Sequence, residues 1–226
     1  MPKLLPIVLS AERKSWRMLD VHADESDKRY HAIRQTVLER DSYTCQYCAF
    51  KADRYQEIHH IDHDHGHNQL SNLNTACAFC HMDFHLGMAG IRNAGLIIWC
   101  PEHTQADLNN LVRAIFIAVA NNGVHEAAAR SLYQGLETRA SAIEEYLGKG
   151  ASSPSAIGQA FLKISEKAYA TRDERLEGLR LLPKMNAFGK QIAYWQSDVK
   201  LFGALADKEW ERLLPAPQPT QESAEA

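Results

Sequence analysis

The chain has 226 residues, 45% of them apolar, and carries 25 Lys and Arg against 28 Asp and Glu, a formal net charge of -3. This composition predicts a globular protein of one domain or two small ones, and the charge excludes the domain-wide positive field that attracts nucleic acid. The apolar runs fall far short of the ~20 residues that span a bilayer. We therefore expect a cytoplasmic protein that does not insert into a membrane.

Residues 1–42 are predicted to form helices that pack on the core. Apolar side chains recur at helical spacing from Ser10 to Arg40, and the charged stretch from Asp24 to Asp27 divides this pattern into two helices. The apolar positions that carry the pattern are Trp16, Leu19, Tyr30, Ile33, Val37 and Leu38.

Four of the five cysteines form two Cys-x-x-Cys pairs, Cys45 with Cys48 and Cys77 with Cys80. Each such turn presents two thiolates from one tight loop, so two turns supply the four tetrahedral ligands that Zn²⁺ prefers. The spacing predicts a closed, structural zinc site, and the alternative is two pairs of unrelated buried thiols. Cys100 lies in an apolar run and is expected to be a buried small hydrophobe, with a redox or fifth-ligand role as the alternative.

Residues 43–102 are predicted to form the zinc module. β-Branched and aromatic residues between Tyr55 and Ile61 predict a strand, and a helix is expected after Cys77. The run from Gly95 to Cys100 predicts a second strand or a buried turn, which Pro101 ends.

Histidines are concentrated around the two Cys-x-x-Cys turns. They are His59, His60, His63, His65, His67, His81 and His85. Because His81 and His85 are i, i+4 on the expected helix, their imidazoles share a face, and His59 from the strand can complete an open three-histidine metal site. His60 is then the candidate general base, with Asn72 holding the loop and orienting it. We expect His63, His65 and His67 to be loop residues, since no spacing rule singles them out.

Residues 103–214 are predicted to form a helical extension. A helix starts at Thr104, capped by Asp107, and two more are expected around residues 128–147 and from Ser153. The first of these helices has an apolar stripe formed by Leu108, Leu111, Val112, Ile115, Phe116 and Val119. An aromatic-rich final helix is expected to run to Trp210, and residues 215–226 lack large apolar side chains and are predicted to form a disordered tail. Core packing is expected for most of the apolar residues in these stripes, and Trp99, Trp195 and Trp210 are the candidate interface anchors to mutate.

Two motifs of the predicted module resemble the HNH endonuclease signature. They are Glu57-Ile58-His59-His60-Ile61 and Asn72-Leu73-x-x-x-Cys77-x-x-Cys80-His81-x-x-x-His85. The resemblance implies His60 as the base, Asn72 as its orienting residue, and a second divalent metal on His59, His81 and His85. The loop Asp62-His-Asp-His-Gly-His-Asn68 departs from the Gly-Gly loop that the family often has at this place.

Charge around these histidines argues against a nuclease. Between residues 43 and 90 the acidic side chains outnumber the basic ones, which are Lys51 and Arg54. An endonuclease normally surrounds its site with Lys and Arg that neutralise phosphates. The alternative to a nuclease site is therefore an inherited set of histidines that only form hydrogen bonds within the fold. A shared fold does not by itself fix an activity.

A longer resemblance covers most of the chain. It is carried by the segments Leu9 to Leu19, Arg40-Asp-x-x-Thr44-Cys-Gln-x-Cys48, Leu70-Ser-Asn-Leu73, Thr75-Ala-Cys77 and Pro101-Glu102-x-x-Gln105-x-x-Leu108-Asn109. Together these segments resemble the DotN (IcmJ) family of Dot/Icm type IV secretion systems and related conjugation machinery.

The DotN resemblance implies a fold and a role. The fold is α+β and mainly helical, with an HNH-like ββα-metal module, N-terminal helices and a helical C-terminal extension. The role is that of a zinc-binding adaptor in a coupling complex, which binds the C-terminal region of the coupling ATPase and other coupling-complex subunits, and which lies peripherally at the inner membrane through that complex. The competing hypothesis is a metal-dependent HNH DNA endonuclease with His60 as general base, which alone requires nucleic acid as a partner.

Overall fold

The computed structural model describes residues 4–11, 23–64 and 66–197 and shows an α+β fold that is mainly helical, as the sequence predicts. The elements follow one another as α1 (Ala23–Arg40), β1 (Gln56–His60), η2 (Leu70–Asn72), β2 (Leu73–Cys77), α2 (Ala78–Asp83), α3 (Leu86–Ile91), β3 (Gly95–Trp99), α4 (Gln105–Asn121), α5 (Glu126–Thr138), α6 (Ala140–Leu147), α7 (Pro154–Lys163), α8 (Glu166–Ala170), α9 (Arg172–Arg175), β4 (Leu179–Pro183), η3 (Met185–Phe188) and α10 (Gly189–Ser197). None of the helices in these ranges is long and apolar enough to cross a membrane.

The first half of the chain contains a ββα module, which we define as residues 43–91. Strand β1 pairs antiparallel with β2, in a register that sets Gln56 opposite Cys77 and His60 opposite Leu73, and α2 follows β2 directly. Helix α1 covers this hairpin, where Val37 and Leu38 pack with Ile58 and Leu73 in a small core of their own.

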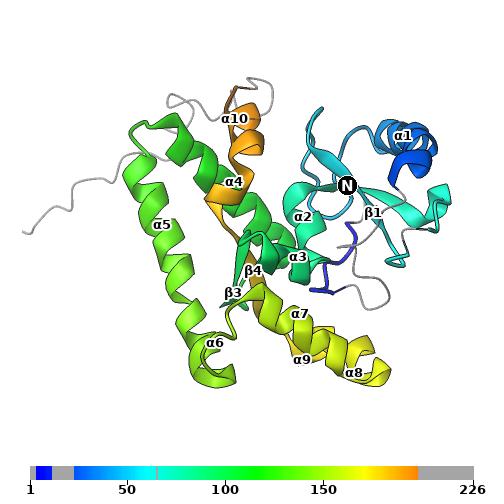
Figure 1. The fold of residues 1–226 in the computed structure, drawn as a ribbon. Helices are drawn as coiled ribbons and strands as arrows, with labels where there is room; N and C mark the ends of the chain where they lie inside the picture. The colour runs from blue at the N-terminus through cyan, green and yellow to red at the C-terminus, as the bar shows by residue number, and fades with distance from the viewer. Residues whose placement is uncertain (1–3, 12–22, 65, 198–226) are drawn as a thin grey trace, which may run out of the picture.

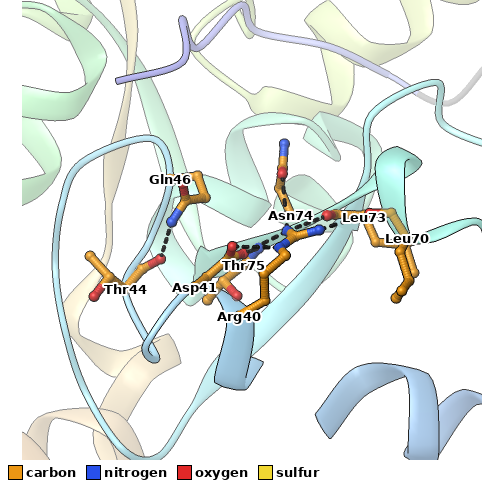
Figure 2. A network of polar contacts seen from close by, with 8 residues as sticks. All are labelled: Arg40, Asp41, Thr44, Gln46, Leu70, Leu73, Asn74 and Thr75. Carbon is orange, nitrogen blue, oxygen red and sulfur yellow. Dashed lines mark hydrogen bonds and ion pairs between the residues drawn. The ribbon is translucent and has the colours of Figure 1, made fainter. Parts of the chain in front are cut away.

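Two consecutive residues fasten the end of α1 to β2 (Figure 2). The guanidinium of Arg40 donates to the carbonyl oxygens of Leu70 and Leu73 and to the carboxylate of Asp41, with N–O distances of 2.7 to 2.9 Å. Asp41 in turn accepts from the backbone N–H of Thr75 at 2.9 Å. The Arg-Asp pair therefore fixes where the chain leaves the helix and enters the first cysteine turn.

The second half, residues 95–197, is built on a two-stranded sheet. Strand β3 pairs antiparallel with β4, with Gly95 opposite Pro183 and Trp99 opposite Leu179. Helices pack around this sheet: α4 contacts β4, α6 contacts β3, and α4 runs beside α5 (Figure 1).

The ββα module and the second half share one core. Its buried members include the four cysteines of the two Cys-x-x-Cys pairs together with Phe79, Phe116 and Trp195. A further contact joins α3 to α7, where a Cβ added to Gly90 would lie 1.8 Å from Ser155 Oγ and 2.5 Å from its backbone nitrogen. The two helices approach so closely that position 90 has no room for a side chain.

An extended N-terminal segment, residues 4–11, lies between the two halves. Ser10 donates through its backbone N–H to Asp83 O and accepts from Leu86 N, both at 3.0 Å. On the other side Arg172 Nε donates to Leu9 O at 3.0 Å, and Tyr169 Oη donates to Ala11 O at 2.9 Å. The segment thus binds α2 and α3 on one side and the α8–α9 region on the other.

Several expectations about the elements are confirmed. Thr104 caps α4 by accepting from Asp107 N at 3.1 Å, and α7 begins at Pro154 after Ser153. The apolar stripe of α4 is buried, apart from a partly exposed Leu111. Cys100 is fully buried, as expected of a small hydrophobe.

Other expectations are wrong. The stretch from Asp24 to Asp27 does not break a helix, because it lies in the first turns of α1, where negative charge is favourable. Strand β4 occupies a region in which we expected helices. The expected helix at residues 128–147 divides at Arg139 into α5 and α6. For Trp195, by contrast, the expected core packing is confirmed, because this side chain is 1% exposed and does not serve as an interface anchor.

Some predictions fall on residues that lie outside the described ranges. They concern the apolar positions Trp16 and Leu19, the loop residue His65, the end of the final helix at Trp210, and the tail at 215–226. These stay predictions.

Candidate functional site

The four cysteines of the two Cys-x-x-Cys pairs come together in the core. Their Sγ atoms all lie within 4.8 Å of one another, and all four residues are buried. Four buried sulfur atoms at such spacing can hold one metal ion.

Local structure explains how these sulfurs converge. The first turn is closed by Cys45 N–H donating to Phe50 O at 2.9 Å and by the bridge between Thr44 and Lys51. The buried amide of Gln56 donates to Phe50 O at 2.9 Å, which ties this turn to β1. Cys77 ends β2 and is the N-cap of α2, so Cys80 follows within the first turn of that helix.

Helix α4 supplies a buried cation to the cysteine site. Arg113 is 2% exposed, its Nη2 donates to Cys77 Sγ at 3.1 Å, and its guanidinium carbon lies 3.8 Å from the ring centre of Phe50. Asn109 from the same helix donates to Cys80 Sγ at 3.3 Å. Such contacts stabilise thiolates, which carry negative charge in a metal site.

The same environment shifts the proton equilibria of the site. Burial raises the pKa of Cys45 and of Cys80, whereas hydrogen bonds from Cys45 and Cys77 lower the pKa of Cys48. Burial disfavours the charge of Arg113, but the charges of Cys77 and Cys48 outweigh it and raise the Arg113 pKa. A permanently charged guanidinium therefore faces sulfurs that must lose protons to bind a metal.

A second group of polar residues in the ββα module lies around His59. The His59 side chain is 3% exposed, its ring stacks on Phe84 with centres 4.0 Å apart, and its Nδ1 contacts Tyr47 Oη at 2.6 Å. Burial and the charges of neighbouring imidazoles such as His81 lower the pKa of His59 to about 2, so this ring is neutral at pH 7.

His81 and His85 do not share one helix. Helix α2 ends at Asp83, and His85 precedes α3 as its N-cap. The intervening Phe84 keeps a helical backbone conformation and His85 N donates to Met82 O at 3.0 Å, so the chain continues the turn. The rings of His81 and His85 consequently stay 4.7 Å apart between their centres.

The predicted histidine ligands are brought together, but less tightly than the cysteines. Ring centres of His59 lie 5.8 Å from His81 and 6.3 Å from His85. Within the described residues, the histidines do not form a group whose ligand atoms all approach within 4.8 Å. Glu57 accepts a hydrogen bond from Nδ1 of His81, which leaves Nε2 of that ring directed elsewhere.

Asn72 holds the loop between the strands, as predicted, although its described contacts do not include His60. Its Nδ2 donates to Asp62 Oδ1 at 2.8 Å and to His67 O at 2.9 Å. The Nε2 of His60 instead lies 2.9 Å from Oδ1 of Asn68. Among the contacts described for the candidate base, Asn68 therefore takes the place expected of Asn72.

Sequence reasoning missed the residues around the ligands. Asn109 and Arg113 had little signal in the sequence, because each follows an apolar position of α4 by one residue and lies beside the stripe, and only the structure shows that both are buried. Tyr47 and Glu57 had none beyond their nearness to the motifs, since their roles depend on contacts across the hairpin.

Within the part of the chain that the structure describes, one further group has metal-ligand chemistry, namely Cys100, Glu102 and His103. Arg139 lies within it, where its Nη1 donates to Cys100 Sγ at 3.3 Å and also to the Glu102 carboxylate. A guanidinium already supplies the positive charge there, so we interpret this group as an ion pair and not as a metal site.

Comparison with known proteins agrees with this geometry. The model of the HNH endonuclease family matches residues 45–85, the span that holds the four cysteines and the histidines of the ββα module. The type 4 apparatus protein DotN of Legionella pneumophila subsp. pneumophila strain Philadelphia 1 is 36% identical over 189 residues. That match covers 83% of this chain and 87% of the relative, and so extends well beyond the HNH span into the helical half. The chain therefore belongs to the DotN family of type 4 apparatus proteins, and its residues 45–85 are similar to an HNH endonuclease domain.

Proposed function

We propose that this chain is a zinc-binding adaptor subunit of a type IV secretion or conjugation coupling complex. In this role it binds the C-terminal region of the coupling ATPase together with other coupling-complex subunits. The observation that carries the proposal is the extent of the kinship: similarity to DotN covers 83% of the chain, whereas the HNH family model covers residues 45–85.

Zinc has a structural role in this proposal. Cys45, Cys48, Cys77 and Cys80 supply four sulfur ligands, which complete a tetrahedral coordination and leave no position for a substrate. Arg113 compensates part of the charge of four thiolates. The metal then stabilises the cysteine turns, which are too small to bury a core of their own.

The partner surface lies on the helical half or between it and the ββα module. Of the three candidate tryptophan anchors, Trp99 is 44% exposed, while Trp195 is buried. Exposed aromatic side chains contribute strongly to protein interfaces because they bury a large area with few rotatable bonds. Trp99 is therefore the anchor to test.

The direct test is co-purification of this protein with a tagged C-terminal segment of the ATPase. We expect the wild type to be retained and Trp99→Ala to be retained at least tenfold less, with unchanged circular dichroism. Leu132→Ala on α5, also an exposed apolar residue at 61%, is the matched control for loss of apolar surface. Failure of the folded wild type to bind any part of the segment would overturn the adaptor proposal.

A second candidate is a metal-dependent HNH endonuclease, which the match of the HNH family model favours. His60 would take a proton from the attacking water, and His59, His81 and His85 would hold the metal. Supercoiled plasmid incubated with Mg²⁺, Mn²⁺ or Ni²⁺ tests it. Nicking by the wild type and not by His60→Ala would establish the nuclease, while intact plasmid in both reactions supports the adaptor.

A further inference from the structure

His63, expected from the sequence to be a loop residue, lies against the histidine cluster. Its ring centre is 5.3 Å from that of His59 and 6.4 Å from that of His85. Its Nδ1 is buried and has no hydrogen-bond partner among the described residues. His63 thus contributes a third buried ring nitrogen without a hydrogen-bond partner, in addition to one on His59 and one on His81.

The rings of His59 and His81 each have one nitrogen in contact with a neighbouring side chain. Tyr47 contacts Nδ1 of His59, and Glu57 accepts from Nδ1 of His81. In both rings the remaining nitrogen, Nε2, is buried and has no hydrogen-bond partner among the described residues. Metal-binding histidines characteristically have one nitrogen fixed by such an outer partner and the other on the metal.

Buried nitrogens without partners are costly. Each loses a hydrogen bond to water on folding and gains none among the described residues. Three of them in one cluster, on His59, His63 and His81, are explained together if a cation lies between the rings. Neutral imidazole is a good ligand for divalent zinc, nickel and copper.

We propose that His63 is the fourth ligand of a second divalent metal site, completing the set of His59, His81 and His85. Imidazoles bound tetrahedrally through nitrogens about 2.1 Å from a metal have ring centres about 5.3 Å apart. Five of the six ring pairs have centre separations between 4.7 Å, for His81 and His85, and 6.4 Å, for His63 and His85. In these pairs the separations differ from that geometry by about 1 Å or less, so the rings need to shift before their nitrogens share one metal.

A fourth histidine changes what the site can do. Three histidines leave a coordination position for water or phosphate, as a catalytic metal needs, whereas four histidines close the tetrahedron. The second site is then structural like the first. This inference goes beyond the secretion role, because it depends on metal binding alone.

Cobalt is the probe for this site, because tetrahedral Co²⁺ absorbs visible light far more strongly than five- or six-coordinate Co²⁺. Full-length protein whose cysteine site holds zinc is titrated with Co²⁺, and the absence of thiolate charge-transfer bands verifies that the cysteines are not occupied by cobalt. We expect the wild type to bind one Co²⁺ with a strong tetrahedral spectrum. His63→Ala should bind at least tenfold more weakly and give a shifted spectrum, because water replaces the fourth imidazole, and free imidazole should restore the wild-type spectrum.

His67→Ala is the matched control, because His67 lies in the same loop and pairs with Asp62 through its Nδ1 at 2.6 Å. This variant should keep the wild-type affinity and spectrum. Unchanged circular dichroism and retained cysteine-bound zinc verify that each variant is folded. Absence of a second bound metal in the wild type, or a His63→Ala variant with wild-type affinity and spectrum, would overturn the proposal.

Discussion

Arg113 Nη2 donates to Cys77 Sγ at 3.1 Å and so connects helix α4 to the last residue of β2. The guanidinium is buried against Phe50 and the cysteine sulfurs, where a charge is tolerated only beside an opposite charge. The cysteine site is therefore completed by a helix from the other half of the chain.

Replacing this arginine should weaken both the fold and the metal site. We expect Arg113→Met to lower the free energy of unfolding by about 3 kcal/mol, because it removes one member of a buried charged pair. Arg113→Lys should lower the free energy of unfolding by less, since lysine keeps the charge but not the planar geometry of the guanidinium. Urea denaturation and the rate of zinc transfer to a chelator measure the two effects. Wild-type stability and zinc retention in Arg113→Met would contradict this account.

The cysteine site should hold one zinc per chain. A thiol-blocking mercurial should release that zinc, which distinguishes it from any metal on histidine. Cys77→Ser should lose the zinc and unfold the ββα module, because structural zinc binding contributes roughly 10 kcal/mol or more that is also folding energy. Cys100→Ser is the control, since Cys100 lies outside the site. Protein purified without chelator that contains no mercurial-releasable zinc would refute the site.

The Arg40–Asp41 pair should make stability depend on pH in the acid range. Burial alone would raise the pKa of Asp41, but hydrogen bonds from Arg40 and Thr75 outweigh it and lower that pKa. The stabilisation is then complete above the unfolded pKa near ~3.9 and is lost as pH falls through the lower folded value.

Asp41→Asn tests this dependence. At pH 7 we expect it to reduce the free energy of unfolding by about 1–3 kcal/mol, as for a hydrogen bond to a charged group. The difference between wild type and variant should narrow as pH falls below ~4, since the wild-type carboxylate then becomes protonated. A difference that stays constant from pH 7 to pH 2.5 would show that the charge of Asp41 contributes nothing.

The contact between α3 and α7 can be tested with two glycines. Gly90→Ala places a methyl group against the backbone nitrogen of Ser155 and should lower the free energy of unfolding by about 1–3 kcal/mol through overpacking. Gly135→Ala in α5 meets no atom within 4 Å and should raise it by about 0.5–1 kcal/mol, because alanine loses less entropy in a helix. Thermal melts of both variants measure these changes in stability. A Gly90→Ala variant as stable as the wild type would contradict the close approach of α3 and α7.

The sequence was informative wherever structure depends on neighbours in the chain. The spacing of Cys45 and Cys48 predicted a turn, and Thr104 and Ser153 predicted helix starts, because a cap or a knuckle is made by residues within a few positions. Family motifs added the HNH-like module, which the match over residues 45–85 confirms.

Features made by distant residues escaped prediction. Strand β4 is short and becomes a strand only by pairing with β3, from which helices α4 to α9 separate it. The donation from Arg113 to Cys77 likewise joins positions 36 residues apart. Hydrophobic spacing carries no information about which remote partner a residue meets, so such contacts need the structure.

The N-terminal segment has a consequence for synthesis. Ser10 contacts Leu86 and Leu9 contacts Arg172, so at 5–20 residues per second the ribosome synthesises the second partner about 4–17 s after the first. During that interval the backbone groups of Asp83 and Leu86 can already hold Ser10, but nothing holds the segment from the opposite side. The earliest described residues to leave the ribosome are thus fixed in place only when most of the chain has followed them.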